Sequence, residues 1–88
     1  MSQQNLDYVR SRLEVEAEKL AGFSTKGQQL RKIRFREALK VIIDNDLMLT
    51  RARIEKSWQK ATERLEADGY KLELPSEVFK RVFFEELK

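Results

Sequence analysis

Seven lysine and arginine side chains stand at spacings that would align them along two helices. Residues three or four apart share one face of a helix, so each set forms a basic stripe. Rows of cations are the chemistry that binds nucleic-acid phosphates, with an affinity that falls as salt rises. We predict these residues to contact nucleic acid: Lys32, Arg36, Lys40, Arg53, Lys56, Lys60 and Arg64.

The charges in the second set are segregated by sign. Glu55, Glu63 and Glu66 occupy the opposite flank from the cations, whereas a solvated surface usually mixes both signs. Gln59 lies on the acidic flank, so phosphate contact is favoured over base readout. Two ordinary solvated helix faces would give the same pattern, and whether the two stripes converge depends on how the helices cross.

The residue types needed for most catalysis are missing. The chain has no histidine and no cysteine, which excludes imidazole acid–base chemistry, thiol nucleophiles and disulfides. Glu14 and Glu18 share a helix face, but such carboxylates are usually solvated. No glycine-rich phosphate loop is present. We predict a protein that is not an enzyme, with no metal, no cofactor and no small-molecule substrate.

The composition indicates an all-α fold that would position these stripes. The 88 residues suffice for one small domain, with 41% hydrophobic and 38% charged residues. One proline and three glycines are too few for strands joined by tight turns. We predict a compact four-helix single domain, with helices at about 3–21, 28–44, 51–67 and 76–87.

Local signals set the predicted boundaries and faces. Residues 23–27 read as a loop and 70–74 as extended or loop. Thr50 is a good N-cap, and Asp68-Gly69 ends the third helix. In the second helix Phe35 points toward the core, so the basic stretch RKIRFR divides around the helix. The inner stripe of the first helix is predicted to be Leu6, Val9, Leu13, Ala17 and Leu20.

Some apolar residues exceed what one small domain easily covers, which indicates a protein partner or self-association. Most of them lie on the last helix, and two point outward from the first. The predicted partner-binding residues are Tyr8, Val15, Phe79, Phe83, Phe84 and Leu87. They support an alternative function as an interaction module, such as an adaptor, inhibitor or antitoxin-like partner, without nucleic-acid contact.

The chain shows no targeting or membrane signal. The first twenty residues have no apolar core of the kind found in signal peptides, and no apolar run reaches membrane-spanning length. We therefore predict a cytoplasmic protein without a membrane partner.

The second half of the chain contains a recognisable pattern of apolar and polar residues. Its positions are Val41, Ile42, Asn45, Leu49, Ile54, Ala61, Arg64, Leu65, Lys71, Leu72, Pro75, Ser76, Val78 and Lys80. Over residues 41–81 this pattern resembles the Hha/YmoA family, small helical modulators of bacterial gene expression. Thr62 and Phe79 depart from that pattern, where the family has an acidic residue and a tryptophan. The resemblance implies docking on the nucleoid protein H-NS and a basic DNA-facing surface that includes Arg64 and Lys80.

Together these features predict a small regulatory or accessory protein. It would associate with DNA, or with a DNA-bound complex that regulates transcription, through the basic faces of its second and third helices.

Overall fold

The computed structural model describes residues 3–19, 25–70 and 76–88. These residues form α1 (Gln3–Lys19), α2 (Thr25–Asp44), α3 (Arg51–Ala67) and α4 (Ser76–Leu87), and none of them forms a strand. The predicted all-α class is confirmed, and α3 and α4 have the predicted bounds. The predicted positions of Leu20, Lys71, Leu72 and Pro75 lie outside the described residues.

The second helix begins earlier than the sequence predicts. α2 starts at Thr25, so the predicted loop was wrong for Thr25–Gly27. Gly27 falls in the first turn, where backbone amides have no acceptor within the helix. A glycine costs about 1 kcal/mol in a helix interior, and a helix of 20 residues tolerates one at its start.

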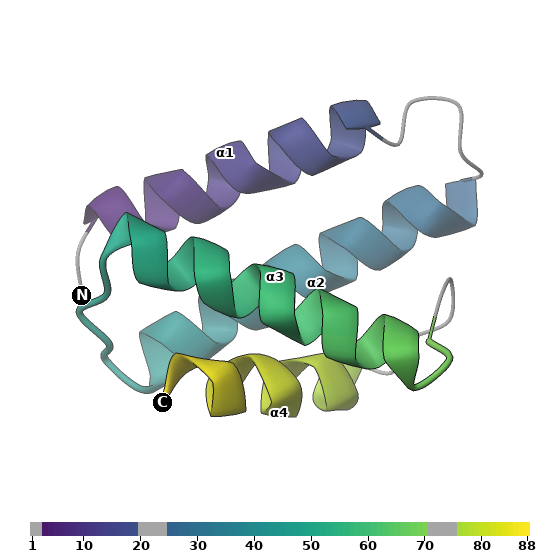
Figure 1. The fold of residues 1–88 in the computed structure, drawn as a ribbon. Coiled ribbons are helices and arrows are strands. Elements are labelled where there is room, and N and C mark those ends of the chain that lie inside the picture. Colours follow the sequence, from purple (N-terminus) through teal and green to yellow (C-terminus); the bar gives the residue numbers. More distant parts are fainter. Residues whose placement is uncertain (1–2, 20–24, 71–75) are drawn as a thin grey trace.

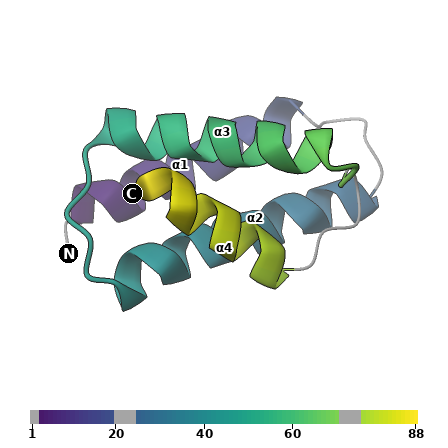
Figure 2. The same cartoon turned by 60° about the horizontal axis from the view of Figure 1, so that its bottom comes forward.

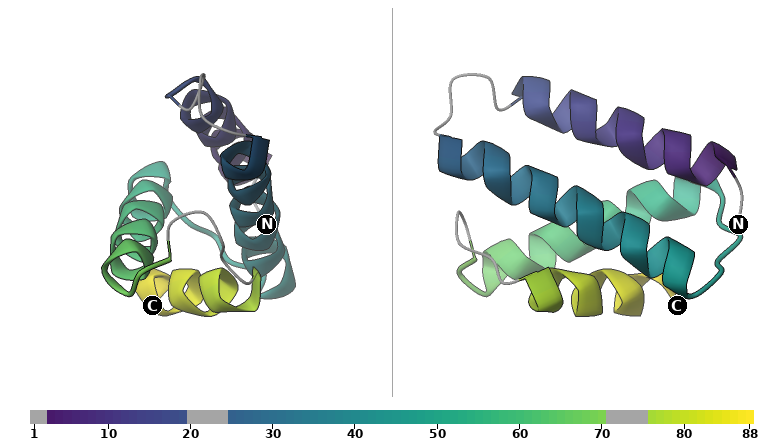
Figure 3. Two further views of the ribbon diagram at one scale, coloured as in Figure 1. Left: turned by 90° about the vertical axis from the view of Figure 1, so that its right-hand side faces the viewer. Right: turned by 180° about the vertical axis from the view of Figure 1, so that it is seen from behind.

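The helices surround the core from different sides. α4 packs against both α2 and α3, and α1 packs along α2 (Figures 1 and 2). α1 approaches α3 only where both helices begin, and from there the two diverge (Figure 3). The backbones of α2 and α3 do not come into contact anywhere in their described residues. These two helices therefore face each other across the core.

Three aromatic rings form the centre of that core. Trp58 meets Phe79 and Phe83 edge-on, with ring centroids 5.9 and 6.3 Å apart. Phe79 and Phe83 stack at 5.8 Å. All three side chains are fully buried, and Phe35 packs against the cluster from α2, as predicted. The broad apolar face of α4 is therefore covered by two helices at once.

The inner face of α1 differs from the predicted stripe. Val9 is buried as predicted, but Ala17 is exposed and Tyr8, predicted to point outward, packs against the core. The polar residues Asn5 and Glu16 are buried instead. The prediction failed because apolar spacing assigns polar residues to the solvent side, whereas this helix buries a carboxylate that is paired with arginines.

Helix ends are fixed by the predicted capping residues. The Thr50 hydroxyl accepts a hydrogen bond from the Arg53 amide at 3.2 Å, which is the geometry of an N-cap. At the other end of α3, the amide of Tyr70 donates to the carbonyl of Leu65 at 2.9 Å. Gly69 makes this closure with φ of +94°, a left-handed conformation.

We expect Gly69→Ala to lower the free energy of unfolding by about 1–2 kcal/mol, because a Cβ is disfavoured at positive φ. A Cβ there would meet no atom within 4 Å. The loss of stability would therefore come from the strained backbone conformation and not from a steric clash. Asp68→Ala in the same turn, with φ of −84°, serves as the control in urea denaturation. Equal stability of the Gly69→Ala variant and the native chain would contradict the assignment.

Candidate nucleic-acid interface

Three cations of α2 form a row on its outer face. Lys32, Arg36 and Lys40 are all exposed and stand four residues apart, so they span about 12 Å of helix. No ion pair between described residues involves any of them. The row therefore presents three positive charges that form no ion pair with a described residue, and Lys32 borders a hollow that Glu14 also lines.

The fold of α2 makes this row point directly away from the core. Leu30, Ala38 and Val41 are buried, and they lie on the side of the helix opposite Arg36. These inner residues pack into the hydrophobic core, which α3 and α4 cover from the other sides. The direction of the row thus follows from burial of the opposite face.

Two cations of α4 lie against the opposite side of α2 from this row, where Val41 packs. Lys80 and Arg81 line a groove with Val41 and Asn45, between α4 and the C-terminal half of α2. Lys80 was marked only by the family resemblance, and Arg81 was missed by the sequence analysis. Arg81 could have been predicted from its place on the polar face of the last helix. Glu77 lies in the same groove and offsets part of this charge.

In the α3 stripe, two of the four predicted cations are bound within the protein. Arg53 reaches the end of α4, where its Nε donates to the Leu87 carbonyl at 2.9 Å and its Nη2 to the Lys88 carbonyl at 2.8 Å. A cation at a helix C-terminus satisfies carbonyls that have no partner in the helix. Arg53 therefore anchors α4 to α3.

Arg64 pairs with the acidic end of α4. Its Nη1 lies 2.9 Å from Glu86 Oε2 and its Nη2 lies 3.1 Å from Glu85 Oε1. Hydrogen bonds to Glu86 and then Glu85 raise the pKa of Arg64 above its ordinary value. Its charge is thus largely offset on the protein's own surface.

The remaining α3 cations border a small hollow. Lys56 and Lys60 are exposed, and they line it together with Lys88 and Glu86. The Ser57 hydroxyl donates to the Glu86 carbonyl at 3.2 Å and closes the floor between α3 and α4. This is a second, smaller basic surface with an acidic residue inside it.

The two stripes do not join. The α2 row points away from the core, while the α3 stripe borders α4, which Arg53 and Arg64 contact. α2 and α3 lie on opposite sides of the core (Figure 3). A single surface of seven cations is therefore not formed.

Three of the six predicted partner-binding residues are inside the protein. Phe79, Phe83 and Leu87 are 0–3% exposed, so placing them on a partner surface was wrong. Phe84 is half-buried beneath the Lys88 ammonium, which lies 4.8 Å from its ring centroid. Val15 is exposed. The apolar face of α4 that motivated the interaction-module alternative is therefore largely buried within the domain.

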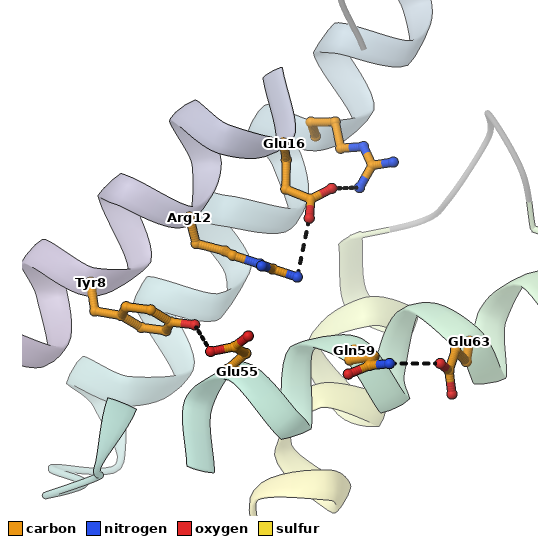
Figure 4. A network of polar contacts seen from close by, with 7 residues as sticks. Tyr8, Arg12, Glu16, Glu55, Gln59 and Glu63 are labelled. Carbon is orange, nitrogen blue, oxygen red and sulfur yellow. Dashed lines mark hydrogen bonds and ion pairs between the residues drawn. The ribbon is translucent and has the colours of Figure 1, made fainter. Parts of the chain in front are cut away.

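A polar network joins α1 to α2 and α3 (Figure 4). Glu16 is buried, accepts a hydrogen bond from Arg31 at 2.5 Å and forms an ion pair with Arg12 at 3.3 Å. Tyr8 donates its hydroxyl to Glu55 at 3.0 Å. Burial and then this hydrogen bond raise the pKa of Tyr8. The network fixes the position of α1 with polar contacts where apolar contacts are few.

Arg34 is a buried cation beside this network. It is 2% exposed, and its guanidinium carbon lies 5.8 Å from the centroid of the Phe79 ring. Burial lowers its pKa, the charge of Arg31 lowers it further, and Glu66 and Glu16 raise it. Arginine remains charged at neutral pH even so. The interior therefore holds a positive charge near Glu16.

The described residues contain neither a metal site nor a helix that could span a membrane. No group of three acidic side chains in residues 3–19, 25–70 and 76–88 is placed to hold a metal ion. Among the described helices, none has the length and apolar character of a membrane span.

A scan against protein-family models finds no match for this chain, and searches of curated proteins and of solved structures find none either.

Proposed function

We propose that this protein is a non-enzymatic accessory factor that associates with the phosphate backbone of duplex DNA through α2. The observation that carries the proposal is the exposed row Lys32, Arg36 and Lys40, which has no acidic partner among the described residues. Unpaired cations release condensed counterions from DNA when they bind phosphate, which is a favourable, salt-dependent contribution.

The position of the row supports this function over readout of bases. The row lies along one helix, and it contains only lysine and arginine side chains. Lysine and arginine contacts with phosphate fix a protein on DNA but carry no sequence information directly. The proposed binding is therefore sequence-independent.

The family resemblance bears on the proposal at two residues. Lys80 lies on the α4 side that borders α2, whereas Arg64 lies against Glu85 and Glu86 on the side that borders α3. A DNA-facing surface that contained both would have to include opposite flanks of α4. We propose a structural role for Arg64, and we propose the α2 row alone as the DNA interface.

We expect the native chain to bind a short duplex with an affinity that falls steeply with salt, and the α2 row to account for part of that slope. Replacing Lys32, Arg36 and Lys40 with alanine removes three phosphate contacts. The slope of log K against log salt concentration should become shallower by about 2.7. Fluorescence anisotropy across a salt series measures it.

A matched variant controls for net charge. Lys56→Ala, Lys60→Ala and Lys88→Ala remove the same three charges from the hollow between α3 and α4, and should leave the slope nearly unchanged. Equal effects of the two triple variants would show a response to net charge and contradict an α2 interface. Absence of duplex binding by the folded native chain at low salt would contradict the proposed function.

A further inference from the structure

The groove between α4 and the C-terminal half of α2 lies on the side of α2 away from the α2 row. Its volume is about 230 Å³, which is below the roughly 300 Å³ at which pockets for small molecules begin. The space therefore suits a side chain of a partner protein better than a whole small molecule. The residues that line it are Val41, Asn45, Glu77, Lys80, Arg81 and Phe84.

Phe84 supplies the apolar surface of this groove. Its side chain is half-buried, so part of it stays open to solvent. Val41 is 1% exposed and belongs to the core, so a partner would touch Phe84 and not Val41. Among the predicted partner-binding residues of α4, Phe84 is thus the one that a second protein can reach.

Three cations stand around Phe84. Lys80 and Arg81 precede it by four and three residues, which places them beside it on the surface of α4. The Lys88 ammonium lies 4.8 Å from the centroid of its ring. None of the three forms an ion pair with a described residue. Among the residues that line the groove, only Glu77 is acidic, so positive charge is in excess.

Asn45 supplies a polar group at the α2 edge of the groove. Its Nδ2 donates to the Val41 carbonyl at 2.9 Å, which holds the side chain in place and leaves its amide oxygen as an acceptor. A peptide N–H can donate to that oxygen. A phosphodiester backbone cannot, because it carries no N–H group.

This combination of groups favours an acidic protein segment over nucleic acid. A phosphodiester backbone has no apolar side group for Phe84, and Glu77 repels it because every phosphate is negative. A peptide can place an apolar side chain on Phe84, carboxylates beside Lys80 and Arg81, and a neutral residue opposite Glu77. Complementary charges of this kind give a protein interface its specificity.

We propose that this groove docks an acidic segment of a partner protein. One apolar side chain of the segment lies on Phe84, and the flanking carboxylates meet Lys80, Arg81 and Lys88. The site goes beyond the proposed DNA contact and does not rest on it, since that contact uses another side of α2. Together, the two contacts make the protein a link between duplex DNA and an acidic protein.

The test uses the full chain and a short fluorescein-labelled peptide in which one phenylalanine is flanked by aspartates and glutamates. Amide NMR should show saturable shifts at Asn45 and at residues 77–84, while residues 32–40 stay unchanged. A peptide with asparagine and glutamine in place of the acids should bind at least about tenfold more weakly, because it loses several ion pairs. A peptide with serine in place of phenylalanine should also bind more weakly. Absence of saturable shifts, or equal affinity of the three peptides, would overturn the proposal.

Substitutions separate the groove from net charge. Lys80→Gln with Arg81→Gln removes two cations of the groove and should weaken binding of the acidic peptide about five- to tenfold. Lys56→Gln with Lys60→Gln makes the same change of charge at exposed residues of α3, and should change the affinity by less than about twofold because salt screens distant charges. Anisotropy of the labelled peptide measures both variants. Equal losses would show a response to net charge and overturn the groove as the site.

The same variant distinguishes a failure of this inference from a failure of the proposed function. Lys80→Gln with Arg81→Gln should leave the salt slope of duplex binding unchanged. Unlabelled duplex should not displace the peptide at physiological salt, where charges more than about 8 Å apart are largely screened. Displacement of the peptide by the duplex would show that the groove binds nucleic acid and overturn the acidic partner. Loss of duplex binding with intact peptide binding would contradict the proposed function alone.

Discussion

Replacing Trp58 with alanine is expected to lower the free energy of unfolding by about 3–5 kcal/mol, the usual cost of deleting a buried aromatic side chain. Trp58 is 1% exposed and touches both Phe79 and Phe83 edge-on. Its loss leaves a cavity against two rings that no neighbouring helix can easily fill. A domain of this length has on the order of 4–13 kcal/mol of total stability, so much of the chain should be unfolded.

The measurement is urea denaturation followed by far-ultraviolet circular dichroism, because the only tryptophan is removed. Trp58→Phe keeps an aromatic ring and removes the buried Nε1 donor, which has no partner among the described residues. We expect this variant to lose less than about 1.5 kcal/mol. Ile43→Ala removes an isoleucine that is 52% exposed and should cost less still. Equal losses for Trp58→Ala and Ile43→Ala would refute the position of the core.

Glu16→Gln is expected to lower the free energy of unfolding by about 2–3 kcal/mol. Removing one member of a buried ion pair costs roughly 3–5 kcal/mol, and an exposed pair contributes at most about 1 kcal/mol. The side chains of Arg12 and Arg31 are 21% and 19% exposed, which places this pair between the two limits. Arg34 adds a third positive charge nearby, so loss of the carboxylate leaves a cluster of cations.

Glu14→Gln is the matched control, since Glu14 is exposed on the same helix and should change stability by less than about 0.5 kcal/mol. A double variant, Glu16→Met with Arg31→Met, should recover most of the loss, because an apolar pair avoids the desolvation of both charges. Denaturation at low and high salt separates these effects from surface screening. Similar losses for Glu16→Gln and Glu14→Gln would show that the buried pair is not important for stability.

The sequence predicts best where apolar spacing decides the structure. In α3, Ile54, Trp58, Ala61 and Leu65 follow helical spacing and all four are buried. In α4 the same reasoning found the apolar face but assigned part of it to a partner. The width of that face is explained by two neighbours, α2 and α3. How many helices cover a face depends on tertiary arrangement, which periodicity along one helix does not contain.

The candidate interface could be predicted only in part for a related reason. The sequence correctly aligns Lys32, Arg36 and Lys40, because helical spacing alone determines that row. It gives no sign that Arg53 and Arg64 are bound at the end of α4, since their partners lie 21 to 35 residues further along the chain. Nor does it predict that α1 buries Glu16, because its arginine partner Arg31 belongs to another helix.

The mainly polar attachment of α1 has a consequence for how the protein opens. Val9 is the one fully buried apolar side chain among the described residues of α1, whereas α2, α3 and α4 share the aromatic cluster and its surroundings. Regions with few buried apolar contacts open locally at a lower free energy than the whole protein. α1 is therefore the helix that detaches first, as a separate cooperative unit. When it leaves, Arg31 and Arg34 lose Glu16, so the partly unfolded form is more cationic along α2 than the native protein.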